Sequence, residues 1–176
     1  DLINNKTPSK DLSDNDKQYK DALEYYEKFK LGTKKNDAGL LAIMSDNNKW
    51  KIPTLVRYWS EKFGLDTRLV YAMIYQESSG NPYLDEAAYG LMQCEKSCYF
   101  GRKQTIKFLD GSTKSFTPSY STMKPGSQGK TTINGVKVDK AVSNQIMFGC
   151  HELRQRAEDF HFNVFATLIG YNFGKA

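Results

Sequence analysis

The chain has 176 residues, of which 39% are hydrophobic and 26% charged, and this composition is typical of one globular domain. No apolar run approaches the roughly 18 residues that a membrane span needs, which excludes a transmembrane segment in this sequence. The net charge of +5 favours a polyanionic partner, but the absence of a block that interleaves basic and stacking aromatic residues argues against nucleic acid.

Residues 1–50 are expected to form an N-terminal linker and an accessory helix. The first 13 residues are polar and lack periodicity, whereas residues 14–31 carry apolar side chains at helical spacing and end before Gly32. Residues 32–51 combine a polar loop with a short apolar segment, which indicates a helical turn. The chain begins without an initiator Met or a signal peptide, so we expect it to be part of a larger multidomain protein.

Two helices are predicted next. The first follows Pro53, a residue suited to a first turn, and ends at Gly64. The second begins after Asp66, a suitable N-cap, and its apolar face reaches one turn beyond Met73 to Glu77. A carboxylate that continues an apolar face is either a satisfied core residue or a functional acid. Burial would raise its pKa towards the range in which a general acid works.

The sequence between Gln93 and Ser143 differs in its residue pattern from the helical segments before and after it. Asp110-Gly111 and Asn134-Gly135 each separate two short alternating runs, a pattern that predicts two hairpins with two-residue turns. We therefore expect a small β insertion at about 99–140 within a helical domain of residues 51–176. Helical spacing returns after residue 141, and a last apolar helix is expected at about 162–171.

The sequence predicts no cofactor and no metal site. His151 and His161 are ten residues apart, which is not the one-turn spacing of paired zinc ligands on a helix. Cys94 or Cys150 beside His151 is a less favoured arrangement for a nucleophile, because small buried thiols are far more common. With Cys98 as the third thiol, at most one intrachain disulfide is possible.

Four short motifs follow one another in a specific order. They are Glu77-Ser78 at a helix end, Gly90-Leu91-Met92-Gln93, Asn144-Gln145-Ile146 with Gly149, and Tyr171-Asn172-Phe173-Gly174. From about residue 52 to the end, this order resembles the soluble lytic transglycosylase family, lysozyme-like enzymes that cleave the glycan strands of peptidoglycan. The resemblance implies a mainly α-helical (α+β), lysozyme-like fold with a small β-hairpin insertion.

The resemblance also implies roles for individual residues. Glu77 would be the catalytic acid, and Ser78 would help to order the substrate and the acid. Gly90, Leu91, Met92 and Gln93 would line the floor of the glycan groove. Tyr171 would contact Glu77, and Asn172 would hold the closing helix in place. The bond cleaved would join N-acetylmuramic acid to N-acetylglucosamine through a β-1,4 linkage and leave 1,6-anhydromuramyl ends.

Two alternatives stay open at this stage. Glu95 follows the Gly-Leu-Met-Gln element by two residues, and goose-type lysozymes have a carboxylate at that spacing. If Glu95 or Asp85 acts as a second carboxylate, the chain would be a hydrolytic muramidase, and Glu86 is a further candidate for this role. A wall-binding or structural module without turnover is the third interpretation. An extracellular or cell-wall location is expected for all three, whether the parent is a phage tail, a conjugation apparatus or a secreted autolysin.

Overall fold

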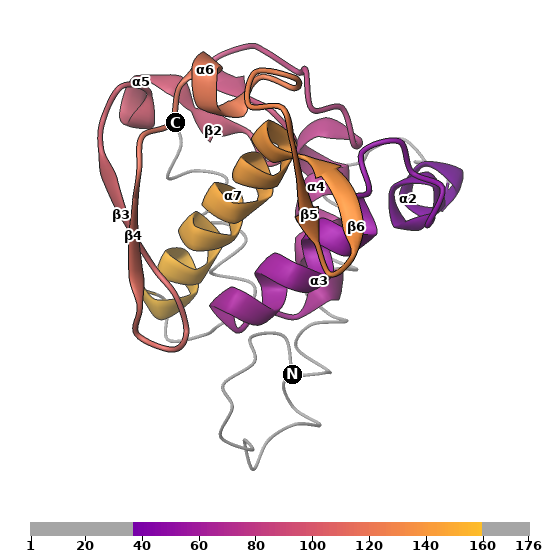
Figure 1. Ribbon diagram of the computed structural model, residues 1–176, viewed down its shortest axis with the longest axis horizontal. Coiled ribbons are helices and arrows are strands. Elements are labelled where there is room, and N and C mark those ends of the chain that lie inside the picture. The colour runs from indigo at the N-terminus through magenta and orange to yellow at the C-terminus, as the bar shows by residue number, and fades with distance from the viewer. Residues whose placement is uncertain (1–36, 160–176) are drawn as a thin grey trace.

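The computed structural model describes residues 37–159, so the helices expected at 14–31 and 162–171 lie outside the described residues. Three helices come first in this part of the chain, and pairs of short strands are then separated by single helices (Figure 1). In order, they are α2 (Asp37–Met44), α3 (Ile52–Phe63), α4 (Thr67–Ser78), β1 (Ala88–Tyr89), β2 (Cys94–Glu95), α5 (Lys96–Tyr99), β3 (Gln104–Lys107), β4 (Thr113–Phe116), α6 (Tyr120–Met123), β5 (Lys130–Ile133), β6 (Val136–Asp139) and α7 (Lys140–Asp159).

Helices α3 and α4 begin and end at the residues that the sequence predicts. Pro53 occupies the first turn of α3, and Gly64 closes the helix in a left-handed conformation with φ of 66°. Asp66 caps α4, because its Oδ1 accepts a hydrogen bond of 2.8 Å from the backbone N–H of Arg68. These local signals set where α4 begins and so place Glu77 in the last turn of this helix.

Helix α7 crosses the middle of the molecule, between the β3–β4 hairpin and α3 (Figure 1). The indole N–H of Trp59 on α3 donates to the Ser143 hydroxyl on α7 over 3.0 Å, which joins the two helices inside the core. Fully buried side chains from α3, α4, β3 and the segment after β1 share one core cluster with those of α7, and include Leu55, Val56, Leu69, Met73, Ile74, Leu91 and Ile106. One hydrophobic core therefore supports every described helix that carries a candidate site residue.

The strands form three separate antiparallel pairs, β1 with β2, β3 with β4 and β5 with β6. Asn134 and Gly135 form the expected two-residue turn, with φ of 49° and 78°. The prediction of a two-residue turn at Asp110-Gly111 is wrong, because residues 108–112 form a five-residue loop. Asp110 Oδ1 accepts hydrogen bonds from the backbone N–H and hydroxyl of Ser112, so the Asp stabilises a wider turn instead.

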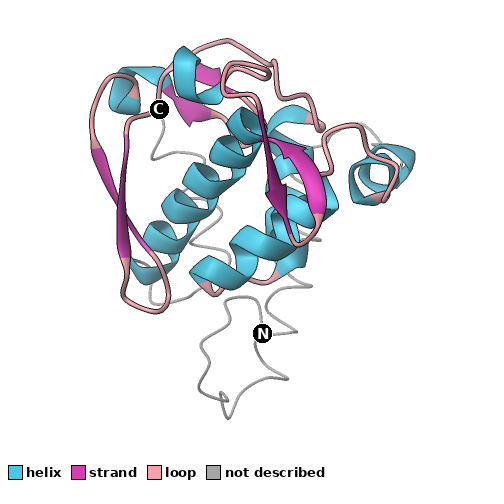
Figure 2. Ribbon diagram, in the orientation of Figure 1, coloured by secondary structure: helices cyan, strands magenta, loops and turns pink. Residues whose placement is uncertain are grey.

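The fold class agrees with the expectation of a mainly helical α+β domain with a small β part (Figure 2). The β3–β4 and β5–β6 hairpins both lie within the expected insertion at 99–140. Between residues 37 and 159, no helix combines the length and the apolar composition that crossing a bilayer requires. The division into residues 1–50 and 51–176 stays a prediction.

Candidate active site

Glu77 lies in the last turn of α4, where the sequence places it. The helix stops because Ser79 adopts a left-handed conformation, with φ of 53°, and its N–H closes onto the Tyr75 carbonyl. The Glu77 side chain is half-buried, and its Oε1 atom is enclosed by the protein. The preceding turn of the same face, Met73 and Ile74, is fully buried. Glu77 is thus a carboxyl at the boundary between the core and the surface.

Ser78 connects the end of α4 to the Gly90–Gln93 segment. Its side chain is buried, and its hydroxyl lies 2.7 Å from the Leu91 carbonyl and 3.0 Å from the Ile74 carbonyl. The same hydroxyl accepts from the Gly80 N–H over 3.2 Å. In this arrangement Ser78 positions the backbone on either side of Glu77, and its hydroxyl is occupied by protein groups.

The Gly90–Gln93 segment forms a tight loop between β1 and β2. Gly90 and Gln93 both have positive φ, 87° and 53°, and the Gln93 amide donates to the Gly90 carbonyl over 2.9 Å. The side chains of Leu91, Met92 and Gln93 are buried. The segment is joined through the Ser78 hydroxyl to the end of α4, which it supports, and its expected contact with a glycan stays a prediction.

Gln145 on α7 fixes this support by three hydrogen bonds to three separate segments. Its Oε1 accepts from the Leu91 N–H over 2.7 Å, and its Nε2 donates to the carbonyls of Pro82 over 3.0 Å and Met123 over 2.6 Å. The side chain is 2% exposed. A primary amide offers one acceptor oxygen and two donor hydrogens, so all of its hydrogen-bonding groups are used. Gly90 lacks the Cβ that would collide with this amide.

The neighbouring residues of the third motif complete the connection between α7 and the loops. Asn144 donates from its side-chain amide to the Thr122 carbonyl over 2.9 Å, which ties α7 to α6. Gly149, one turn later, provides the space that the Met92 side chain fills, because a Cβ there would overlap the thioether. The Asn144–Gly149 motif thus acts on the site through packing and backbone contacts.

Asp85, one of the candidate second carboxylates, is held by a cation and a phenol. Lys96 Nζ lies 2.6 Å from its Oδ1, and the Tyr120 hydroxyl donates to the carboxylate over 3.0 Å. The hydrogen bond from Lys96, then that from Tyr120, keeps the pKa of Asp85 below its ordinary value. A carboxylate held ionised in this way is a weak base.

Glu95, the other candidate, lies at the end of β2 opposite Ala88. Its Oε1 accepts from the Ser97 hydroxyl over 3.1 Å, and its side chain is half-buried. No cation is paired with it in the part of the chain that the structure describes. Glu86 is exposed on the preceding loop, while Tyr171 and Asn172 lie outside the described residues.

The thiols and the one described imidazole do not form an activated nucleophile. Cys94 and Cys150 are buried, Cys98 is exposed, and no disulfide joins any of these three described residues. Burial raises the pKa of Cys150 far above its ordinary value and lowers the pKa of His151 to about 4, so both groups are neutral near pH 7. Within residues 37–159 no three His, Cys, Asp or Glu side chains gather where they could hold a metal ion.

The three bonds of Gln145 and the ion pair of Asp85 are the parts of the site that the sequence does not reveal. Gln145 contacts backbone groups 54 and 63 residues earlier in the chain, and Asp85 contacts a phenol 35 residues later. Periodicity and turn chemistry report only on near neighbours. The one available signal is the place of Gln145 within the third motif.

Residues 54–124 match the family model described as the transglycosylase SLT domain. The matched span contains Glu77, Ser78 and the Gly90–Gln93 segment, and it ends before the Asn144–Gly149 motif. No match was found among curated proteins or among solved structures. The match supports an enzyme of the peptidoglycan glycosidase or transglycosylase kind, with peptidoglycan as its substrate. It confirms, over residues 54–124, the resemblance of the chain to the soluble lytic transglycosylase family.

Proposed function

We propose that this chain is a lytic transglycosylase that cleaves the β-1,4 bond between N-acetylmuramic acid and N-acetylglucosamine, with Glu77 as its general acid and base. The observation that carries the proposal is the position of Glu77. Its carboxyl lies at the edge of the core, at the end of a helix whose last residue is bonded to the Gly90–Gln93 segment. The family match over the same residues supports the peptidoglycan substrate.

The chemistry requires only one carboxyl group. A glycosidic oxygen is a poor leaving group until it is protonated, and a protonated Glu77 supplies that proton. The N-acetyl group of the muramyl sugar stabilises the positive charge that develops at its anomeric carbon. Glu77, now a carboxylate, then takes the proton from the C6 hydroxyl of the same sugar. The C6 oxygen attacks the anomeric carbon and closes the 1,6-anhydro ring.

A muramidase that adds water to the same bond is the second candidate, with Glu95 or Asp85 as its second carboxylate. Lys96 and Tyr120 occupy Asp85 and lower its pKa, which makes Asp85 a poor activator of water. Glu95 has only the Ser97 hydroxyl as a described partner, so Glu95 is the carboxylate that a hydrolytic reaction would use.

The test is mass spectrometry of the soluble fragments released from purified peptidoglycan. We expect 1,6-anhydromuramyl ends from the native chain and none from Glu77→Gln, which keeps the shape of the side chain and removes its acidity. Glu61→Gln is the matched control, because Glu61 is an exposed acid on α3 and its loss should leave the products unchanged. Reducing muramyl ends that disappear in Glu95→Gln would establish the muramidase instead.

The same measurement decides against the third interpretation. Unchanged release of fragments by Glu77→Gln would contradict the assigned acid, and the absence of any release by the native chain would leave a wall-binding module. The site of action in this proposal is the cell wall, outside the cell. The net charge of +5 supports attraction to an anionic wall that weakens as salt rises. A larger parent protein, whether a phage tail, a conjugation apparatus or a secreted autolysin, accommodates this activity.

A further inference from the structure

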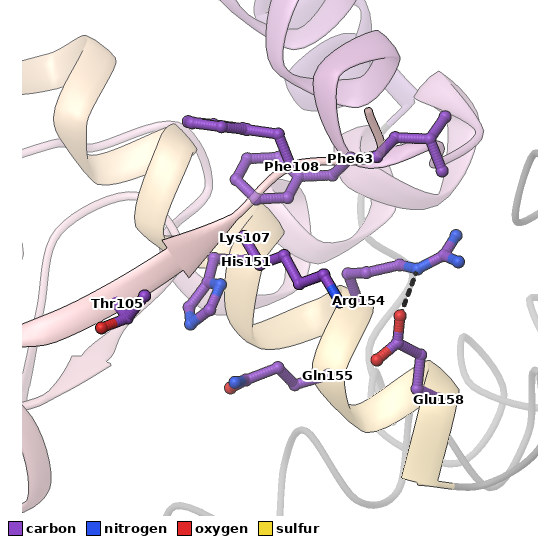
Figure 3. Close-up of a pocket in the computed structure, with 9 residues that line it drawn as sticks. Phe63, Thr105, Lys107, Phe108, His151, Arg154, Gln155 and Glu158 are labelled. Atoms are coloured by element: carbon purple, nitrogen blue, oxygen red, sulfur yellow. Dashed lines mark hydrogen bonds and ion pairs between the residues drawn. The ribbon is translucent and has the colours of Figure 1, made fainter. Parts of the chain in front are cut away.

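A cavity of about 260 Å³ lies between β3 and the second half of α7. Figure 3 shows that Thr105 and Lys107 on β3 face His151 and Gln155 on α7 across this space. Thr105 and Lys107 share one face of the strand, whose other face is the buried Ile106. Two packed elements usually meet through apolar side chains, whereas these two present polar groups to a hollow.

His151 is the most deeply buried polar group of the cavity. It is 4% exposed, and its ring packs against the rings of Phe63 and Phe148 with centroid distances of 6.2 and 5.8 Å. No hydrogen bond joins its ring nitrogens to a group between residues 37 and 159. Burial keeps the pKa of the ring at about 4, so the imidazole is neutral at pH 7 and presents one N–H donor and one acceptor nitrogen. Buried polar groups normally have a hydrogen-bond partner.

The charges around the cavity leave one cation in excess. Arg154 and Glu158 neutralise each other through a contact of 3.1 Å, seen as the dashed line in Figure 3. Lys107 is exposed at the rim, and no carboxylate within residues 37–159 is paired with it. Phe63 and Phe108 form an aromatic wall, with ring centroids 5.2 Å apart. The cavity therefore offers a positive rim, neutral polar groups and an apolar wall.

We propose that this cavity binds a small monoanion consisting of a carboxylate and a short apolar group, as found at the C-terminal residue of a peptide. Lys107 pairs with the carboxylate, His151 supplies a hydrogen bond, and the apolar group packs on Phe108. The cavity volume lies below the roughly 300–1,000 Å³ of sites for drug-sized ligands, which restricts the ligand to a small number of non-hydrogen atoms. This binding is separate from the cleavage of glycan strands and stands or fails independently of it.

The test is NMR of the imidazole nitrogens during titration with N-acetylalanine. The chain has only two histidines, so a His161→Gln variant assigns the two signals. We expect a saturable shift of the His151 nitrogens with N-acetylalanine and none with N-acetylalaninamide, which has the same shape without the charge. Propionate tests whether the ligand is a peptide end or a free carboxylic acid. Weaker binding of propionate than of N-acetylalanine would identify a peptide end, and equal binding would identify a free carboxylic acid.

Lys107→Met should weaken the binding of N-acetylalanine about fivefold, the size expected for an ion pair at a partly exposed rim. Lys137→Met is the matched control, since Lys137 is an exposed lysine on the other hairpin, and it should leave the affinity unchanged. The proposal is overturned if His151 shows no saturable shift, if the neutral amide binds equally well, or if Lys107→Met binds as the native chain does.

Discussion

Replacement of Gln145 by Met tests whether the support of the Gly90–Gln93 segment depends on one amide. Met keeps the length of the side chain and removes all three hydrogen bonds, which leaves the Leu91 N–H and the carbonyls of Pro82 and Met123 without this partner. Each buried backbone group that loses its partner costs about 1–3 kcal/mol. Allowing for relaxation of the loops, we expect a loss of about 3–6 kcal/mol in the free energy of unfolding.

Urea unfolding measures this loss, and Gln128→Met is the matched control. Gln128 also donates to a backbone carbonyl, that of Ser121 over 2.6 Å, but it does so on the exposed surface, where water replaces the bond. The control should change the free energy of unfolding by less than about 1 kcal/mol. A loss of under about 1 kcal/mol in Gln145→Met would refute the argument, because it would mean that the three backbone groups find other partners.

Three further predictions concern single positions. Gly90→Ala should lower the free energy of unfolding in urea by at least about 2 kcal/mol more than Gly111→Ala does. Both glycines have φ near 87°, but only at Gly90 does the new Cβ collide with a neighbouring side chain. Equal losses for the two variants would contradict this argument. His151 has a folded pKa of about 4 and an unfolded pKa near 6.5. The free energy of unfolding that depends on its neutral form is therefore fully present above pH 6.5 and falls by at most about 3 kcal/mol towards pH 4. The variant His151→Phe should reduce this fall, and an unchanged pH profile would exclude the assigned burial of the imidazole. Asp85 has a lowered pKa in the folded state, so its contribution to stability is present above its unfolded pKa and is lost as the pH falls through its folded pKa. Carbon NMR of Lys96→Met should show a higher titration midpoint for Asp85, because the variant removes the ion pair. An unchanged midpoint would rule out this ion pair.

The sequence predicts the parts of this domain that local signals specify. The helix from Pro53 to Gly64, the cap at Asp66, the end of α4 just after Glu77 and the turn at Asn134 all depend on residues within a few positions of one another. The order of the motifs indicates a resemblance to the soluble lytic transglycosylase family, and residues 54–124 match the transglycosylase SLT domain model.

The parts that the sequence does not predict depend on a local competition in one loop and on distant contacts elsewhere. The width of the loop around Asp110 follows from a side-chain bond to Ser112 that competes with the tighter turn. The ionic partner of Asp85 and the three partners of Gln145 appear only when separate segments meet in space. The roles expected for Tyr171 and Asn172 stay predictions, since these residues lie outside the described part of the chain.

The two hairpins inside the insertion affect the cost of bringing Gln145 to Leu91. The chain between these residues is long, but β3–β4 and β5–β6 each bring their own ends together, so the flexible length that remains is roughly halved. Each halving of a loop saves only about 0.6 kcal/mol of closure entropy. The length of the insertion is therefore nearly neutral for stability as long as added residues pair with one another. A whole hairpin could therefore be added to or removed from this part of the surface at little cost in stability, while the Gln145 amide keeps its contact with Leu91.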